Sequence, residues 1–105
     1  MAKRMAALRG SDLSSAVAAI DGWAVEPGDG GLTKRFRFPD FQSAFAFMTA
    51  VALEAERMNH HPEWTNVYAT VDVRLSSHDV GGVTERDLAL ARHMNTVAAR
   101  LAAAD

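Results

Sequence analysis

The chain has 105 residues, enough for one hydrophobic core but not for two, so we expect a single domain over residues 1–105 with residues 1–10 loosely ordered. Its net charge of −2 provides no basic surface, which argues against nucleic acid as a partner, and the absence of cysteine excludes disulfides and thiol catalysis. No apolar run approaches a membrane span of about 20 residues or a signal peptide, so we expect a cytoplasmic protein with no membrane partner.

The first half of the chain predicts a helix followed by two strands. Ser11 or Asp12 is suited to cap a short helix over 11–20, in which apolar residues recur at helical spacing. Alternating segments at 23–26 and 32–38 predict strands. The glycine-rich segment 27–31 between them is typical of a turn and therefore predicts an antiparallel hairpin.

A long helix is predicted after Pro39, with Asp40 as its N-cap. Its predicted apolar stripe is wide, so we expect the helix to pack on the sheet and also on another helix or subunit. The helix must end by residues 59–61, because Pro62 disfavours the helical conformation in the residue before it. The stripe consists of Phe41, Ala44, Phe45, Met48, Ala52 and Ala55, widened by Phe47 and Val51.

Residues 63–76 alternate between apolar and polar side chains throughout. A single extended strand would separate His61 from His78 by roughly 50 Å, at about 3.3 Å per residue. A strand of that length is uncommon in a small domain. We therefore predict a hairpin that turns near residues 68–70, although neither glycine nor asparagine stands at its tip.

The last helix is predicted to begin after Thr84, with Asp87 in the position of a capping box. Leu88, Ala91, Met94, Ala98 and Leu101 form its apolar stripe, and His93 is expected on the surface. The order of elements then predicts an α+β fold, a four-stranded antiparallel sheet with three helices packed on one face (α-β-β-α-β-β-α).

Three of the four histidines lie in two segments at the ends of predicted elements, at His60-His61-Pro62 and at His78. Histidine is suited to proton transfer because its ordinary pKa of about 6.5 leaves both forms populated near neutral pH. A histidine pair at a helix end is, on its own, more often a surface feature that the helix dipole stabilises. The third histidine makes a shared site the stronger interpretation.

These segments resemble the pterin-4a-carbinolamine dehydratase family. The residues that carry the resemblance are Glu56, His60-His61-Pro62, Tyr68, His78 and Asp87, at the spacings of the family pattern. The resemblance implies the fold predicted above and the activity of a 4a-hydroxytetrahydrobiopterin dehydratase, which forms a quinonoid dihydropterin and water during tetrahydrobiopterin recycling. It further implies a small-molecule pterin substrate, no metal or other cofactor, and a homodimer or homotetramer.

The resemblance assigns proton transfer at the 4a-hydroxyl to His60 and His78, and binding or polarisation of the substrate to His61. Which histidine is the acid stays open. Asp87 has two compatible roles, as a helix cap and as a residue that orients a histidine. Ser77, with its neighbours, is a candidate for holding the polar edge of the pterin.

Trp64 is equally suited to flank a pterin ring or to join the core. Glu56 fits a solvated helix carboxylate better than a catalytic one.

Two other classes of function fit part of the pattern. His60, His61, His78 and Asp87 include metal-ligating types, but adjacent histidines make poor joint ligands and no His-x-x-x-His pair occurs. The second class is a non-catalytic dimerisation or interaction module with the same fold. The complete set of histidines favours the enzyme.

Overall fold

The computed structural model describes residues 6–102, which form three α-helices and one four-stranded antiparallel sheet in the predicted order. The predicted fold class is therefore confirmed. Within residues 6–102 no helix has both the length and the apolar character that a membrane span requires. In chain order the elements are α1 (Gly10–Ala18), β1 (Ala24–Val25), the 3₁₀ helix η1 (Pro27–Asp29), β2 (Leu32–Arg37), α2 (Phe41–Met58), β3 (Glu63–Val67), β4 (Thr70–Leu75) and α3 (Glu85–Ala102).

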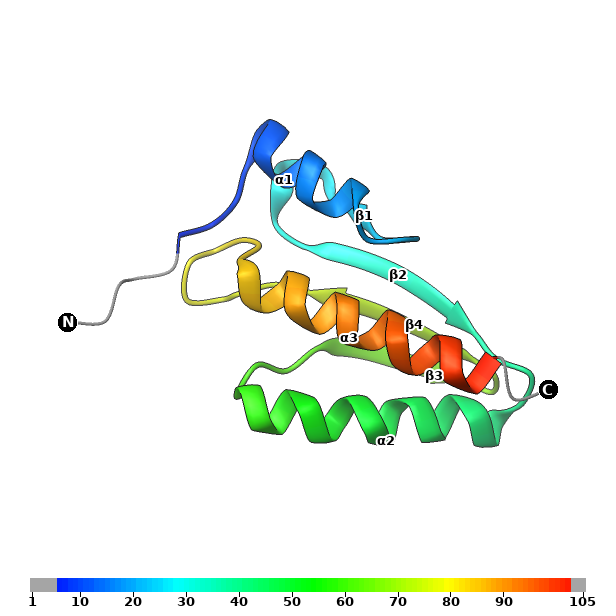
Figure 1. Ribbon diagram of the computed structural model, residues 1–105. Coiled ribbons are helices and arrows are strands. Elements are labelled where there is room, and N and C mark those ends of the chain that lie inside the picture. The colour runs from blue at the N-terminus through cyan, green and yellow to red at the C-terminus, as the bar shows by residue number, and fades with distance from the viewer. Residues whose placement is uncertain (1–5, 103–105) are drawn as a thin grey trace.

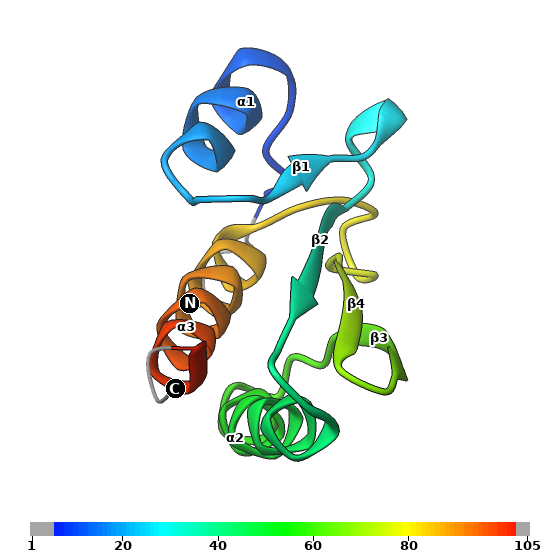
Figure 2. The same ribbon diagram turned by 90° about the vertical axis from the view of Figure 1, so that its right-hand side faces the viewer.

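The sheet has the strand order β1-β2-β4-β3, and each neighbouring pair is antiparallel (Figure 1). All three helices lie on one face of the sheet, and the opposite face is left without a helix (Figure 2). Side chains along each strand alternate between the two faces of the sheet, so the core lies between the sheet and the helices. The side chains turned toward the helices include Leu32 and Phe36 of β2 and Val71 and Val73 of β4.

The predicted hairpin between β3 and β4 is confirmed, and a single strand over 63–76 is wrong. Val67 pairs with Thr70, so the chain reverses at Tyr68 and Ala69. Tyr68 adopts a left-handed backbone with φ 51°. The Asn66 side chain holds the tip by donating from Nδ2 to the carbonyls of Tyr68 and Thr70, each at 3.0 Å. The local turn chemistry thus comes from a residue just before the tip.

Helix α2 begins as predicted at Asp40, whose Oδ1 accepts a hydrogen bond from the Ser43 amide at 2.7 Å. This hydrogen bond from Ser43 to the carboxylate holds the pKa of Asp40 below its ordinary value. The buried stripe of the helix follows a spacing of three and four residues. It consists of Ala44, Phe47, Val51 and Ala55.

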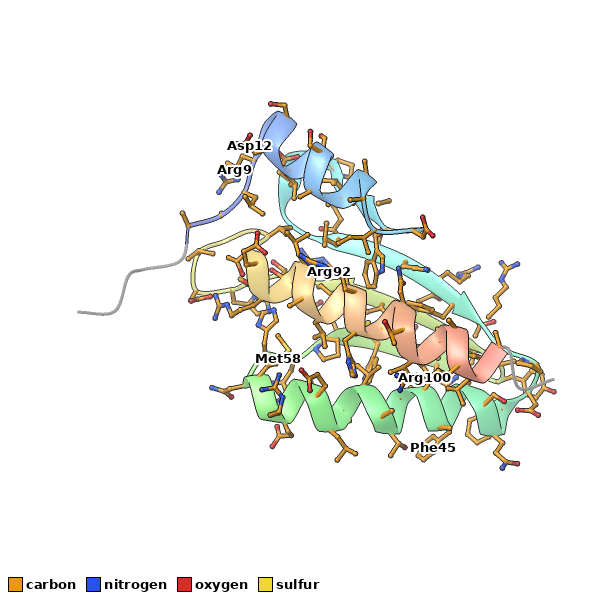
Figure 3. The ribbon with its side chains drawn as sticks, viewed as in Figure 1. Arg9, Asp12, Phe45, Met58, Arg92 and Arg100 are labelled. Atoms are coloured by element: carbon orange, nitrogen blue, oxygen red, sulfur yellow. The ribbon has the colours of Figure 1, made fainter. Side chains whose placement is uncertain are left out.

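The predicted burial of Phe41, Phe45 and Ala52 is wrong for this chain taken alone. The side chains of Phe41 and Phe45 are 49% and 57% exposed, with ring centroids 5.8 Å apart, and Ala52 is also exposed. Figure 3 shows Phe45 on the side of α2 that is turned away from α3. The apolar surface of α2 is wider than the sheet and α3 together cover, so one edge of it faces solvent.

The N-terminal predictions need correction. Helix α1 begins at Gly10 without a side-chain cap, so Ser11 and Asp12 do not have the predicted role. Asp29 replaces them, because its Oδ2 accepts a hydrogen bond from the Gly10 amide at 2.9 Å. The loose order expected of residues 1–10 stays a prediction, although the Leu8 amide pairs with the Val83 carbonyl at 2.7 Å. Residues 1–5 lie outside the described part of the chain.

Helix α3 begins after Thr84 as predicted, and the Asp87 carboxylate accepts a hydrogen bond from the Thr84 amide at 2.9 Å. Its buried side also includes Leu90 and Val97, whereas Ala98 and Leu101 are only partly buried. The surface position predicted for His93 is wrong, because the residue is half-buried and its Nε2 atom is buried without a hydrogen-bond partner.

We predict that Phe47→Ala lowers the free energy of unfolding by about 3–5 kcal/mol, the usual cost of removing a buried aromatic ring. Phe47 is fully buried, and its ring centroid lies 4.7 Å from that of Phe36 and 5.0 Å from that of Phe38. Urea denaturation measures the change. Phe47→Leu serves as the control, because an apolar side chain of intermediate volume should cost less. A loss below about 1 kcal/mol for the alanine variant would contradict the central packing role of this ring.

Candidate active site

Three segments meet at one end of the molecule: the end of α2, the start of α3 and the loop between β4 and α3 (Figure 1). They enclose a hollow of about 420 Å³, a volume within the range of small-molecule sites. The structure thus brings His60, His61 and His78 together. The hollow is lined by Asn59, His60, His61, Pro62, Glu63, Ser76, His78, Asp79 and Arg86.

The end of α2 determines where the two adjacent histidines lie. Asn59 ends the helix in the left-handed conformation, with φ 52°. The His60 amide donates to the Ala55 carbonyl at 3.0 Å and the Asn59 amide to the Glu56 carbonyl at 3.2 Å, which together form a Schellman motif. The chain therefore leaves the helix in a fixed direction. His60 is turned inward and is buried, whereas His61 is exposed.

His60 contacts a buried carboxylate at the start of α3. Its Nε2 atom lies 2.5 Å from Oδ1 of Asp87, which is fully buried. The other carboxylate oxygen accepts hydrogen bonds from the Ser77 hydroxyl at 2.7 Å and from the Thr84 amide at 2.9 Å. Asp87 is therefore bound by groups from three segments of the chain, and it both caps α3 and orients His60.

This geometry assigns the ring proton of neutral His60. A carboxylate only accepts hydrogen bonds, so Nε2 of His60 must donate to Asp87. Nδ1 is then the nitrogen that takes up and releases a proton. No hydrogen bond to Nδ1 is found within residues 6–102. The only buried side-chain nitrogen or oxygen without a partner in that range is Nε2 of His93, so Nδ1 of His60 is not buried and reaches solvent.

His61 has a different carboxylate partner. Its Nε2 atom lies 2.5 Å from Oε2 of Glu56, one turn back on α2, and both side chains are mostly exposed. An exposed pair of this kind contributes little to stability because water screens it. Glu56 therefore contacts His61 without contributing much to the stability of the fold.

His78 lies on the tight loop that connects β4 to α3. Ser77 and Gly82 close this loop through two backbone hydrogen bonds of 2.7 and 3.3 Å, and Gly81 turns the chain with φ 66°. The His78 side chain is 82% exposed, and its Nε2 lies 3.5 Å from Oε1 of Glu63. The loop is thus held in place by its backbone, while the imidazole is open to solvent at the edge of the hollow.

Arg86 and Asp79 form an ion pair at the rim of the hollow. Nη2 of Arg86 contacts both carboxylate oxygens of Asp79, at 2.7 and 3.0 Å. This hydrogen bond from Arg86 is the main reason why the pKa of Asp79 lies below its ordinary value. The rim therefore presents a fixed donor and a fixed acceptor beside His78.

Trp64 and Ser77 do not line the hollow. Trp64 is half-buried and packs against the core on the helix side of β3, and Ser77 is buried beneath the site, where it binds Asp87. The sequence did not predict Asn59, Glu63, Asp79 and Arg86 as residues of the site. The position of Asn59 directly before the histidine pair, where a helix must end, was the one available signal for it.

A larger hollow of about 640 Å³ lies on the open face of the sheet. Its side chains include Arg35, Asp72 and Arg74, and it contains no histidine. Within the described part of the chain, no three histidine, aspartate or glutamate residues converge in a way that would hold a metal ion. The hollow at the end of α2 is therefore the candidate active site, because it combines proton-transferring side chains with a fixed geometry.

The fold and this site together define an α+β protein with three histidines at one hollow, and comparison with known proteins gives the family. A family model described as pterin 4 alpha carbinolamine dehydratase matches residues 6–97. A protein of Rhodopseudomonas palustris (strain BisB18) is 50% identical over 94 residues, 90% of this chain and 93% of the relative. One of Rhizobium leguminosarum bv. trifolii (strain WSM2304) is 45% identical over 97 residues, 92% and 96% of the two chains. Both carry the provisional name pterin-4-alpha-carbinolamine dehydratase.

Solved structures agree with this result. A transcriptional coactivator/pterin dehydratase from Brucella melitensis is 47% identical with a TM-score of 0.85, and the match covers 88% of this chain and 98% of that one. A pterin dehydratase-like protein identified as a RuBisCO assembly factor in the alpha-carboxysome is 26% identical with a TM-score of 0.63, over 73% and 89% of the two chains. The chain belongs to the pterin-4a-carbinolamine dehydratase family.

We predict that Asp87→Asn moves the ring proton of neutral His60 from Nε2 to Nδ1. The asparagine carbonyl would keep the bonds from Ser77 and Thr84, so its amide group would face His60 and donate to Nε2. Nitrogen-15 NMR of the imidazole reports the tautomer. Loss of the charge-assisted bonds should also lower the free energy of unfolding by about 1–3 kcal/mol.

Ser77→Ala is the matched control for this prediction. It removes one donor to Asp87 but keeps the carboxylate, so His60 should keep its proton on Nε2. An unchanged tautomer in Asp87→Asn would show that this carboxylate does not orient His60.

Proposed function

We propose that the protein dehydrates a 4a-hydroxytetrahydropterin to the quinonoid dihydropterin. The observation that carries the proposal is the convergence of His60, His61 and His78 on one hollow, each beside a carboxylate, in a chain of this family. The quinonoid product is at the oxidation level that a reductase returns to the tetrahydropterin, which supports a role in tetrahydropterin recycling. The product differs from the substrate by one water molecule.

The reaction requires two proton transfers. One proton joins the departing 4a-hydroxyl as the carbon–oxygen bond breaks, and one leaves a ring nitrogen whose lone pair forms the new double bond. In this proposal His60 and His78 transfer protons at the 4a-hydroxyl, and His61 binds or polarises the substrate. Nδ1 of His60 carries its exchangeable proton, because Nε2 remains bonded to Asp87. Positioned acid–base groups of this kind accelerate reactions by about 10²- to 10⁴-fold.

A non-catalytic interaction module is the second candidate function. It is supported by the exposed apolar side chains of Phe41, Phe45 and Leu53 on α2. This surface is compatible with catalysis, because none of its three residues lines the histidine hollow. We propose that it serves self-association into a homodimer or homotetramer, since an exposed apolar patch on one helix is typical of a subunit interface.

The parent protein should accelerate the decay of freshly prepared 4a-hydroxytetrahydropterin above its spontaneous rate at neutral pH. His60→Ala and His78→Ala should each reduce kcat by about tenfold or more, because each removes a positioned proton-transfer group. Stopped-flow absorbance measures the decay. His93→Ala is the control, since His93 lies on α3 outside the hollow. A folded parent protein that leaves the spontaneous rate unchanged would refute the dehydratase.

We expect the parent protein to elute as a dimer or tetramer in size-exclusion chromatography with light scattering. Phe45→Glu should shift the mass toward the monomer, because it places a charge in the proposed apolar interface. Thr96→Glu adds the same charge to an exposed site on α3 and should leave the mass unchanged. A monomeric parent protein would contradict self-association.

A further inference from the structure

A fixed arginine on the open face of the sheet lies next to the active site. Nε of Arg74 donates to Oε2 of Glu26 at 2.7 Å, and its Nη1 donates to Oε1 of Glu63 at 2.9 Å. The guanidinium also lies against the backbone of Gly31, where an added Cβ atom would come within 3.2 Å of Cζ of Arg74 and 3.0 Å of Oε1 of Glu26. Arg74 is therefore confined on three sides.

The register of the sheet connects this arginine to Glu63. Glu63 and Arg74 are paired Cα partners on β3 and β4, so their side chains lie on the same face. Glu63 also directly follows Pro62 and lines the histidine hollow. Its side chain therefore spans from the fixed arginine to the site.

Glu63 Oε1 faces two groups at once, Nη1 of Arg74 at 2.9 Å and Nε2 of His78 at 3.5 Å. The distance to His78 suits an ion pair when the imidazole is protonated. The His78 ring is otherwise open to solvent, at 82% exposure, and within residues 6–102 no side-chain hydrogen bond holds it. A carboxylate held by Arg74 limits the rotamers of such a ring, because the carboxylate itself cannot turn freely.

We infer that Glu63 is a positioning residue for His78, held in place by Arg74. Its carboxylate holds Nε2 of His78 and leaves Nδ1 for the substrate, which parallels the contact between Asp87 and His60. The inference rests on the proposed dehydratase function for its effect on rate. The contact between Glu63 and His78 stands independently of that function.

The kinetic test is a double-mutant cycle between Glu63→Gln and His78→Ala. Glu63→Gln keeps the shape of the side chain but removes its charge, and we expect kcat to fall about two- to fivefold with KM unchanged, the range for an exposed pair. In the His78→Ala background the same substitution should have no further effect, because Glu63 acts through His78. Equal losses in both backgrounds, or no loss in the parent background, would overturn the inference.

Asp72→Asn is the matched control. Asp72 pairs with Arg35 on the same face of the sheet, at 2.6 and 3.1 Å, but it does not line the histidine hollow. Its removal should leave kcat unchanged. A loss equal to that of Glu63→Gln would show a general effect of charge on this face and would overturn the specific role of Glu63.

NMR of the imidazole resonances separates this inference from the proposed function. Glu63→Gln should shift the ring signals of His78 and leave those of His60 in place, and Asp72→Asn should shift neither. If the parent protein does not accelerate the dehydration, the proposed function fails. The NMR result alone then still shows whether Glu63 and His78 are in contact. Unchanged His78 signals in Glu63→Gln would overturn the inference.

Discussion

The site depends on the burial of one carboxylate, Asp87. An unpaired buried charge costs several kcal/mol, so Asp87 must be bound by donors, and these come from three parts of the chain. His60 follows α2, Ser77 follows β4, and Thr84 precedes α3. The bonds that satisfy Asp87 thus also fix the distance between the end of α2 and the loop that carries His78. Fold and site are maintained by the same interactions, because both require Asp87 to be fully bonded.

Sequence reasoning predicted the elements well wherever periodicity and caps agreed. Asp40 and the Thr84–Asp87 pair mark the starts of α2 and α3 because a side chain that accepts from nearby amides needs only local geometry. The hairpin tip was harder to predict. Asn66 stabilises it from two residues before Tyr68, and a search for turn residues at the tip itself overlooks such a contact.

The remaining wrong predictions concern residues whose contacts in the fold are distant in the sequence. The stripe of α2 includes Phe45, because periodicity shows which residues share a helix face but not how wide the covering layer is. Trp64 lies on the helix side of β3, whereas Glu63 faces the active site. Neighbouring residues of a strand point to opposite faces of the sheet. The register of β3 with β4 is needed to tell which face each of the two residues occupies. Glu63 itself gives no signal until Arg74 is placed opposite it.

The three histidines differ mainly in the surroundings of their carboxylate partners. Coulomb attraction scales inversely with the dielectric constant. The buried contact with Asp87 therefore constrains the ring of His60 far more than the exposed contacts with Glu56 and Glu63 constrain the rings of His61 and His78. His60 is therefore held in one tautomer, and the other two rings are largely exposed to water. In the proposed dehydration, His60 would provide a proton carrier of fixed geometry at the 4a-hydroxyl, and His78 would provide a second carrier that is open to solvent. The unequal burial of three similar pairs thus supports the different roles proposed for the three histidines.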